Sequence, residues 1–145
     1  MDVIELLEGS SLFAALNKSI LWRIGNLTEE MQFTAGQYLI HQGDEADFCY
    51  LISQGRVQIR LDKNGESPIV INEVGEGEIL GELSLIDELP RSASVVAIEE
   101  VHTFAISAWD FKAQLQAYPE IALQLLPVLA KRLRYTQDQL LRLSK

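Results

Sequence analysis

RVQIRLDKNGESPIVINEV, residues 56–74, is the stretch of this chain that decides the fold. Two runs rich in β-branched residues flank Asn64-Gly65. This dipeptide is favoured in two-residue hairpin turns, because both central φ angles are then positive. The stretch therefore predicts two antiparallel strands joined by a tight turn.

Similar short runs continue on both sides of this hairpin, between about residues 29 and 106. They are YLIHQ, FCYLIS, SVVAI and VHTFAI, and seven glycines between Gly36 and Gly81 help to separate them. The connections are too short for the helical crossovers that a parallel sheet needs. About eight such strands predict an α+β protein built on an antiparallel β jelly roll, or on another double-sheet barrel.

Helical patterns flank the strands at both ends. Apolar residues fall at helical spacings near the N-terminus, and we expect two short helices there, near 11–16 and 18–26. Ser107-Ala-Trp-Asp110 predicts a capping box, in which the serine hydroxyl and the aspartate carboxylate satisfy free amides at a helix start. We expect helix from there to the end, including one long C-terminal helix.

The chain length suits one domain over residues 1–145. We expect N-terminal helices over 1–28, the jelly roll over 29–106 and C-terminal helices over 107–145. Within the jelly roll, residues 80–95 are the segment with the most distinctive chemistry.

We expect a folded protein of the cytoplasm from the composition, the N-terminus and the cysteine count. Hydrophobic residues make up 48% of the chain and charged residues 23%. The acidic N-terminus has no basic or long apolar segment, and no run of about 18 apolar residues occurs, so we expect neither export nor a membrane partner. The single cysteine, Cys49, cannot form an internal disulfide and suits a reducing compartment.

The net charge of −9 is unevenly distributed. Residues 1–130 carry the excess of acidic side chains, whereas 131–145 are mainly basic. An acidic body repels polyanions, and nucleic-acid affinity rests on cations that neutralise phosphates. We therefore expect no direct nucleic-acid binding, and we interpret the basic end as a solvated helix face.

Apolar residues of the last helix follow a heptad. One row is Leu126, Leu133 and Leu140, and the other is Ala122, Leu129, Thr136 and Leu143. Rows sustained over about three heptads predict a seam against a partner helix, and hence a homodimer. The alternative is an amphipathic helix that lies on its own barrel. Thr136 is the polar residue within an otherwise aliphatic seam.

GELSLIDELPRSASV, residues 81–95, places one arginine among acidic and small residues. Free amides at a helix start after Gly81 can hold an anion, and glycine permits a close approach. Arg91 offers a planar fork of donors to the same phosphate or carboxylate, while Glu82 suits a hydroxyl group better. A ligand with one phosphate and a neighbouring sugar hydroxyl satisfies both side chains. The alternative is a buried Glu82–Arg91 ion pair that locks an ordinary loop.

This stretch resembles the phosphate-binding cassette of the cyclic-nucleotide-binding domain family, found in catabolite-activator-type regulators and in regulatory subunits of cyclic-AMP-dependent protein kinase. The matching residues are Gly81, Glu82, Leu83, Leu85, Pro90, Arg91 and Ala93. HQGDEADFCYLISQGRVQI, residues 41–59, is similar to the hairpin that precedes the cassette in that family. The resemblance implies a sensor whose ligand is cyclic AMP, or else cyclic GMP.

The resemblance also implies roles for individual residues. Arg91 would pair with the cyclic phosphate, and Glu82 would accept a hydrogen bond from the ribose 2′-hydroxyl. The assisting backbone amides would be those of Leu83, Ser84, Ser92 and Ala93. Deoxy or non-cyclic nucleotides would therefore bind poorly.

Departures from the family pattern bear on the base. Leu80 and Ser84 stand where the family has Phe and Ala, at the wall of the pocket. Ser92 leaves the choice between adenine and guanine open. Thr136 corresponds to a polar residue of the long C-terminal helix that reaches the base across the dimer in bacterial members.

Other functions suit the sequence less well. Two histidines, His41 and His102, and one cysteine do not make up a metal, haem or iron–sulfur site, and we expect no enzymatic activity. Catabolite-activator-type regulators carry a helix-turn-helix domain beyond the long helix, which we do not expect before Lys145. The alternatives are the sensor portion of such a regulator and a non-binding dimerisation module. We expect bound ligand to reposition the C-terminal helix and so act on a downstream protein partner.

Overall fold

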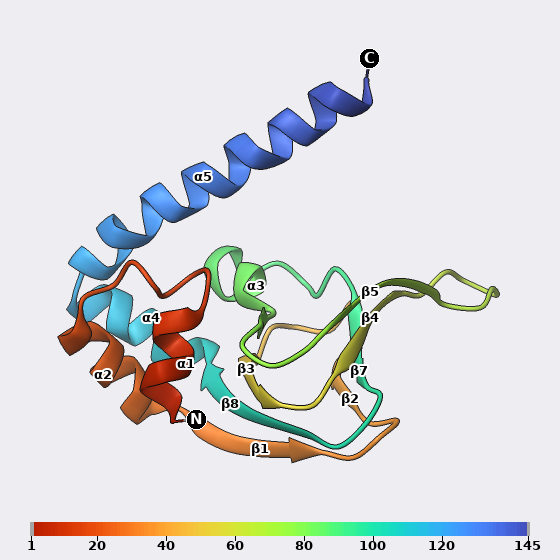
Figure 1. The fold of residues 1–145 in the computed structure, drawn as a ribbon, viewed down its shortest axis with the longest axis horizontal. Helices are drawn as coiled ribbons and strands as arrows, with labels where there is room; N and C mark the ends of the chain where they lie inside the picture. Colours follow the sequence, from red (N-terminus) through yellow and green to blue (C-terminus); the bar gives the residue numbers. More distant parts are fainter. Residues whose placement is uncertain (1, 145) are drawn as a thin grey trace.

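Two four-stranded antiparallel sheets form the centre of the computed structural model, which describes residues 2–144 (Figure 1). The strands are β1 (Glu29–Phe33), β2 (Tyr38–Ile40), β3 (Phe48–Gln54), β4 (Val57–Leu61), β5 (Ile69–Val74), β6 (Ile79–Leu80), β7 (Ser94–Ala97) and β8 (Val101–Ser107). Their order is β1-β8-β3-β6 in one sheet and β2-β7-β4-β5 in the other. This strand order is that of a jelly roll, so the predicted fold class is confirmed.

The predicted hairpin forms, but its loop is longer than expected. β4 and β5 pair only as far as Leu61 and Ile69. Gly65 has a φ of 74°, whereas Asn64 keeps a negative φ. The predicted two-residue turn with two positive φ angles is therefore wrong. Pro68 explains the difference, because it has no N–H with which to extend the ladder toward the turn.

The helices are α1 (Val3–Gly9), α2 (Lys18–Leu27), α3 (Glu82–Asp87), α4 (Ala108–Ala117) and α5 (Glu120–Leu143). The second predicted N-terminal helix is confirmed as α2, but the first is wrong, because residues 11–16 form turns and the helix lies earlier. Asp2 begins α1 by accepting a hydrogen bond from the Glu5 N–H at 2.9 Å. Ser10 ends it in an extended backbone conformation, and both its N–H and its hydroxyl donate to the Leu7 carbonyl.

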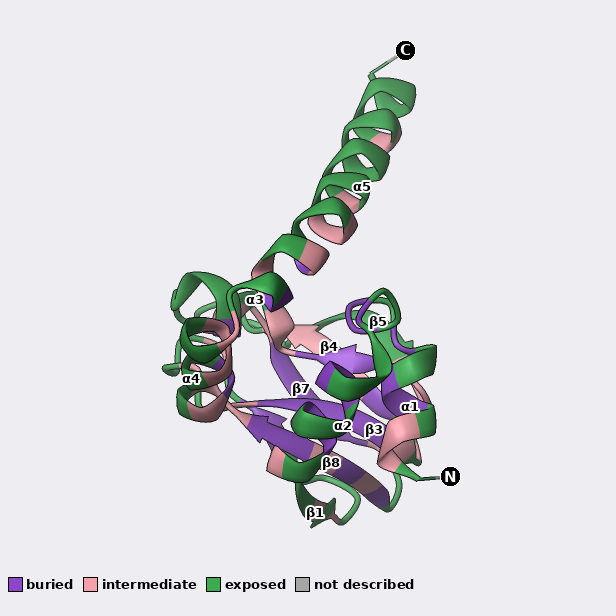
Figure 2. Cartoon of the chain, turned by 90° about the vertical axis from the view of Figure 1, so that its left-hand side faces the viewer, coloured by how far each residue is buried: buried purple, intermediate pink, exposed green. Residues whose placement is uncertain are grey.

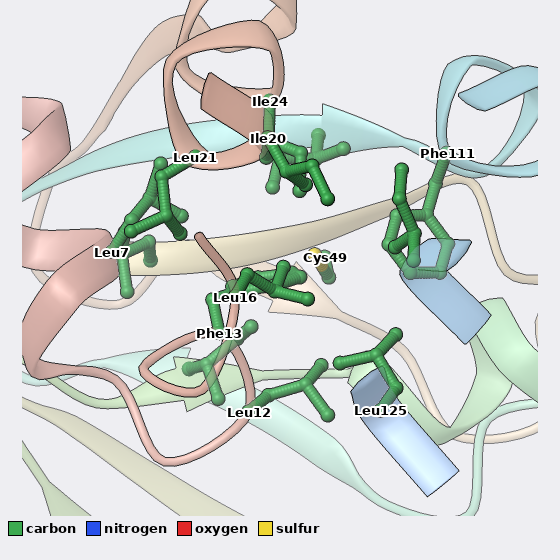
Figure 3. Packing of buried hydrophobic residues seen from close by; sticks show 14 of the residues in the cluster. Leu7, Leu12, Phe13, Leu16, Ile20, Leu21, Ile24, Cys49, Phe111 and Leu125 are labelled. Carbon is green, nitrogen blue, oxygen red and sulfur yellow. The ribbon is translucent and has the colours of Figure 1, made fainter. Parts of the chain in front are cut away.

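The helices and the first sheet share an apolar core, shown in Figure 3. Its buried side chains include Leu7, Leu12, Phe13, Leu16, Ile20, Leu21, Ile24, Cys49, Phe111 and Leu125. Full burial of each large side chain stabilises the fold by about 1.5–3 kcal/mol. A second buried cluster, which includes Ile52, Val57, Leu80 and Val101, lies in the barrel itself.

The last two helices, α4 and α5, follow the barrel in the chain. Ser107 begins α4, and its hydroxyl accepts from the Asp110 N–H at 3.0 Å, which confirms the serine half of the predicted capping box. α5 starts in the core, where Ile121 and Leu125 are buried, and then extends away from the barrel (Figures 1 and 2). The exposed leucines of its outer part include Leu126, Leu133, Leu140, Leu141 and Leu143. The alternative of a helix that lies on its own barrel therefore applies only to the first turns of α5.

None of the helices within residues 2–144 combines the length and the apolar character that a bilayer span requires.

Candidate ligand-binding site

The segment of residues 80–95 folds as a short helix between two strands. β6 leads directly into α3, and Gly81 between them has a φ of 81°. A side chain at this position would also collide with Nη1 of Arg91. Both the backbone conformation and the close approach therefore require glycine here. No side chain caps α3, so the amides of its first turn stay available to a ligand.

A cavity of about 240 Å³ opens beside this segment. Both ends of the segment line it, together with apolar side chains from neighbouring strands. The lining residues are Ile40, Ile59, Ile79, Leu80, Gly81, Glu82, Leu83, Ser84, Arg91, Ser92, Ala93 and Val95. The structure thus brings together around one cavity every predicted site residue except Thr136.

Four apolar residues of the cavity wall, Ile40, Ile59, Ile79 and Val95, were not among the predicted site residues. Ile40, Ile59 and Val95 lie on adjacent strands of the second sheet, and Val95 is paired in register with each of the other two. Residues in register across neighbouring strands point to the same face of a sheet. The sequence signal available for them was their place in the β-branched runs, which does not distinguish a cavity wall from a core.

Arg91 supplies the positive charge of the cavity. Its side chain is 3% exposed, and its guanidinium donates to the carbonyl oxygens of Gly81, at 3.2 Å, and of Phe48. It also donates to the Asp47 carboxylate at 3.0 Å. A buried guanidinium stays charged and needs acceptors around it. Asp47, which the sequence did not single out as a partner of Arg91, provides the negative charge that faces it.

Glu82 pairs with a different arginine. Its Oε1 accepts from Nη1 of Arg132 at 2.9 Å, and Arg132 also donates to the Ser11 hydroxyl. The alternative of a Glu82–Arg91 ion pair is therefore wrong, because tertiary packing brings α5 within reach of Glu82. Arg132 joins α5 to the start of α3 and to the turn before α2. In the sequence, Arg132 is recognisable only as a basic residue beside the heptad rows.

The two hydroxyl groups predicted to select the base lie apart. Ser92 lines the cavity. Thr136 lies on the exposed outer part of α5, where its hydroxyl donates to the Arg132 carbonyl at 2.9 Å. A single chain therefore does not bring Thr136 to the cavity, and its predicted role depends on a second chain.

Burial keeps two side chains beside the site neutral. It raises the pKa of the Cys49 thiol to about 12, and the charge of Glu82 adds to this effect. Burial and the charge of Asp47 raise the pKa of Tyr50 to about 12. Cys49 is therefore a core residue and not a nucleophile, since the thiolate is the reactive form. Across residues 2–144, no cluster of three or more His, Cys, Asp or Glu is arranged to hold a metal ion.

The fold and the site together define a jelly-roll domain with a cavity that contains a buried arginine. Comparison with known proteins specifies the class further, because the family model "Cyclic nucleotide-binding domain" matches residues 30–118. This chain belongs to the cyclic nucleotide-binding domain family.

Three known proteins show how much of each chain the likeness covers. The chain is 34% identical over 131 residues to "Lysophospholipase nte1" of Neosartorya fischeri, which is 90% of this chain and 9% of that protein. The N-terminal domain of a transcriptional regulator from Streptomyces coelicolor A3(2) is similar with a TM-score of 0.82 and 33% identity, over 93% of this chain and 94% of that one. The regulatory domain of Toxoplasma gondii PKA, crystallised with cAMP, is similar with a TM-score of 0.73 and 27% identity, over 77% and 42%.

The chain spans less than a tenth of the length of the curated lysophospholipases that it matches. The likeness covers the nucleotide-binding part alone, so the enzymatic activity in their name is not carried over to this chain.

Proposed function

We propose that this chain is a cytoplasmic sensor that binds cyclic AMP, with cyclic GMP as the second candidate, in the cavity beside α3. The observation that carries the proposal is the meeting of Arg91, Glu82 and the uncapped start of α3 at one open cavity. The Toxoplasma gondii structure with cAMP supports the choice of ligand. The predicted ligand residues Leu80, Ser92 and Ala93 complete the wall around it.

The cyclic phosphate binds at Arg91 in this proposal. Two unit charges about 4 Å apart attract by roughly 4 kcal/mol at an effective dielectric constant of about 20. The amides of Leu83 and Ser84, at the start of α3, add donors that favour an anion. The phosphate thereby competes with Asp47 for the guanidinium. The acidic charge of the rest of the body matters little, because salt screens it beyond about 8 Å.

Glu82 links the ligand to α5. The ribose 2′-hydroxyl donates to the same carboxylate that now accepts from Arg132, so ligand binding changes the contacts of a side chain on α5. A ligand shifts an equilibrium between two helix positions only if it binds them with different affinity. We propose that α5 is repositioned in this way and passes the signal to a downstream protein partner.

A homodimer through α5 is part of the proposal. The outer part of the helix exposes Leu133 and Leu140 at 60% and 61%, and both lie in one heptad row. Pairing with a second α5 would cover them. In such a dimer Thr136 of one chain would reach the base in the cavity of the other, beside Ser92.

One observation favours a second candidate, the sensor portion of a transcription regulator. The Streptomyces coelicolor neighbour is the N-terminal domain of such a protein, and the likeness covers 94% of it. In that case the partner of α5 is a DNA-binding domain, and the ligand site is unchanged. A non-binding dimerisation module is the remaining alternative.

Thermal unfolding with cyclic AMP, cyclic GMP and 5′-AMP tests the proposal. A ligand at 100 times its Kd raises the free energy of unfolding by about 2.7 kcal/mol. Each kcal/mol raises the Tm of a domain of this size by roughly 2–4 °C. We expect cyclic AMP to shift the wild type, 5′-AMP to shift it much less, and Arg91→Ala to lose the shift. The control is Arg56→Ala, which also removes one positive charge from the chain. No shift with either cyclic nucleotide would favour the non-binding module.

A further inference from the structure

A second hollow, of about 660 Å³, lies where the segment of residues 45–48, α3 and the start of α4 meet. We name it the α3–α4 groove. Its apolar lining includes Phe48, Leu85 and Trp109, and Figure 2 shows α3 and α4 next to one another on this side of the barrel. Ser84 lines both this groove and the nucleotide cavity, so the two hollows share α3.

Large apolar side chains are exposed at this groove. Trp109, in its lining, is 83% exposed, and Leu89, between the lining residues Glu88 and Pro90, is 61% exposed. Nothing within the described chain covers the Trp109 ring. Apolar side chains that are exposed together at one hollow with a polar rim are a feature of protein interaction surfaces.

The rim of the groove is acidic. Glu45, Asp47 and Glu88 line it, and the one cation in the lining, Lys112, is already paired with Glu88 at 2.7 Å. Asp47 and Glu88 are each 66% exposed, so a partner can reach both. Arg91 pairs with Asp47, so Glu45 is the rim carboxylate whose charge is not offset by an ion pair. The net negative charge of the rim disfavours nucleic acids, anionic lipids and acidic segments. Cationic side chains complement it.

We propose that the α3–α4 groove docks a basic amphipathic helix from a partner protein. An apolar side chain of that helix packs on Trp109, and its lysine or arginine side chains face the acidic rim, which is the usual way in which an amphipathic helix fills a groove. The site is distinct from the nucleotide cavity, and its existence does not depend on nucleotide binding. Asp47 also holds Arg91, so the groove and the cavity share one carboxylate.

Tryptophan fluorescence of the full chain tests this docking site. The chain has two tryptophans, so Trp22→Phe leaves Trp109 as the reporter at the groove. The probe is a short helical peptide of leucine and lysine, and its control has glutamate in place of lysine. We expect the lysine peptide to move the Trp109 emission to shorter wavelength in a saturable way, and the glutamate peptide to leave it unchanged.

Charge variants test whether the peptide binds at the groove or is attracted by the acidic charge of the whole chain. In the Trp22→Phe chain, Glu45→Gln with Glu88→Gln should weaken peptide binding about tenfold, because two rim charges are lost. Glu29→Gln with Glu30→Gln removes the same charge from β1 and should weaken it less than about twofold. Absence of a saturable shift, or equal loss in both double variants, would overturn the proposal. A change of oligomeric state in Trp109→Ala would also overturn it, since a second copy would then occupy the groove.

Discussion

Arg91 and Asp47 form an ion pair in which a 3% exposed guanidinium meets a 66% exposed carboxylate at 3.0 Å. A buried cation is thus held by an anion that solvent reaches. An exposed partner contributes little to stability and is displaced at low cost, in contrast to a fully buried one. Asp47 is therefore the acceptor that a competing anion would displace most easily, whereas the carbonyl oxygens of Gly81 and Phe48 hold the guanidinium in place.

Asp47→Asn should strengthen binding of cyclic AMP. The asparagine oxygen still accepts a hydrogen bond from Arg91, but the negative charge that competes with the phosphate is gone. We expect the Kd to fall by about threefold to tenfold, as for loss of a partly exposed competing charge. Isothermal titration calorimetry measures this. Asp44→Asn removes a nearby exposed charge that does not contact the guanidinium and should change the Kd less than about twofold; weaker binding in Asp47→Asn would contradict the competition.

Arg132→Gln should disconnect α5 from the cavity. The pair with Glu82 is partly exposed, so the free energy of unfolding should fall by no more than about 1 kcal/mol. In the wild type, cyclic AMP should change amide hydrogen exchange in the outer part of α5. This response should disappear in Arg132→Gln and persist in Arg134→Gln, a loss of charge at an exposed position of the same helix. An unchanged response in Arg132→Gln would exclude this route.

Glutamate in the heptad rows should separate the proposed dimer. Leu133→Glu with Leu140→Glu places charges in the seam, where like charges from two helices repel. We expect sedimentation of the double variant as a monomer at concentrations where the wild type is a dimer. Leu141→Glu is the control, because Leu141 is 63% exposed on the same helix but lies outside both rows. Equal sedimentation of the wild type and the double variant would rule out the seam.

Stability should decrease as pH rises above 9. The Cys49 thiol ionises near its ordinary pKa of 9.0 in the unfolded chain, but burial raises this pKa to about 12 in the folded chain. Between these values the folded state keeps a proton that the unfolded state has released, so each pH unit removes up to about 1.4 kcal/mol. Tyr50 acts in the same direction above its ordinary pKa of 10.0. Urea unfolding measures the slope, which should be smaller in Cys49→Ala; equal slopes would contradict the assignment.

Local patterns predicted most of the fold, and the errors have local causes. The β-branched runs and turn residues were sufficient for the strands. Gly81 and Arg91 alone left both an anion site and an ion pair open, and the family resemblance of residues 81–95 favoured the anion site. The helix expected near 11–16 was wrong because the Asp2 cap begins the helix earlier and the chain leaves it at Ser10 in an extended conformation. The tight turn failed because Pro68 follows it.

Local sequence patterns could not predict the ion pairs of the site. Arg132 lies 50 residues from Glu82, and Arg91 lies 44 residues from Asp47. Contacts at this separation are set by how the barrel and α5 pack, and many acidic residues in the chain offered equivalent charges. The position of Thr136 relative to the cavity depends further on a second chain, which one sequence does not describe.

Titration of cyclic AMP and 2′-deoxy-cyclic AMP into the wild type and Glu82→Ala tests the central claim most directly. We expect cyclic AMP to bind the wild type and the deoxy ligand to bind about tenfold to a hundredfold more weakly, because a hydrogen bond to a charged group is worth about 1.5–3 kcal/mol. The difference between the two ligands should vanish in Glu82→Ala. No heat of binding for cyclic AMP and the wild type, or the same ligand difference in both proteins, would contradict the proposed site.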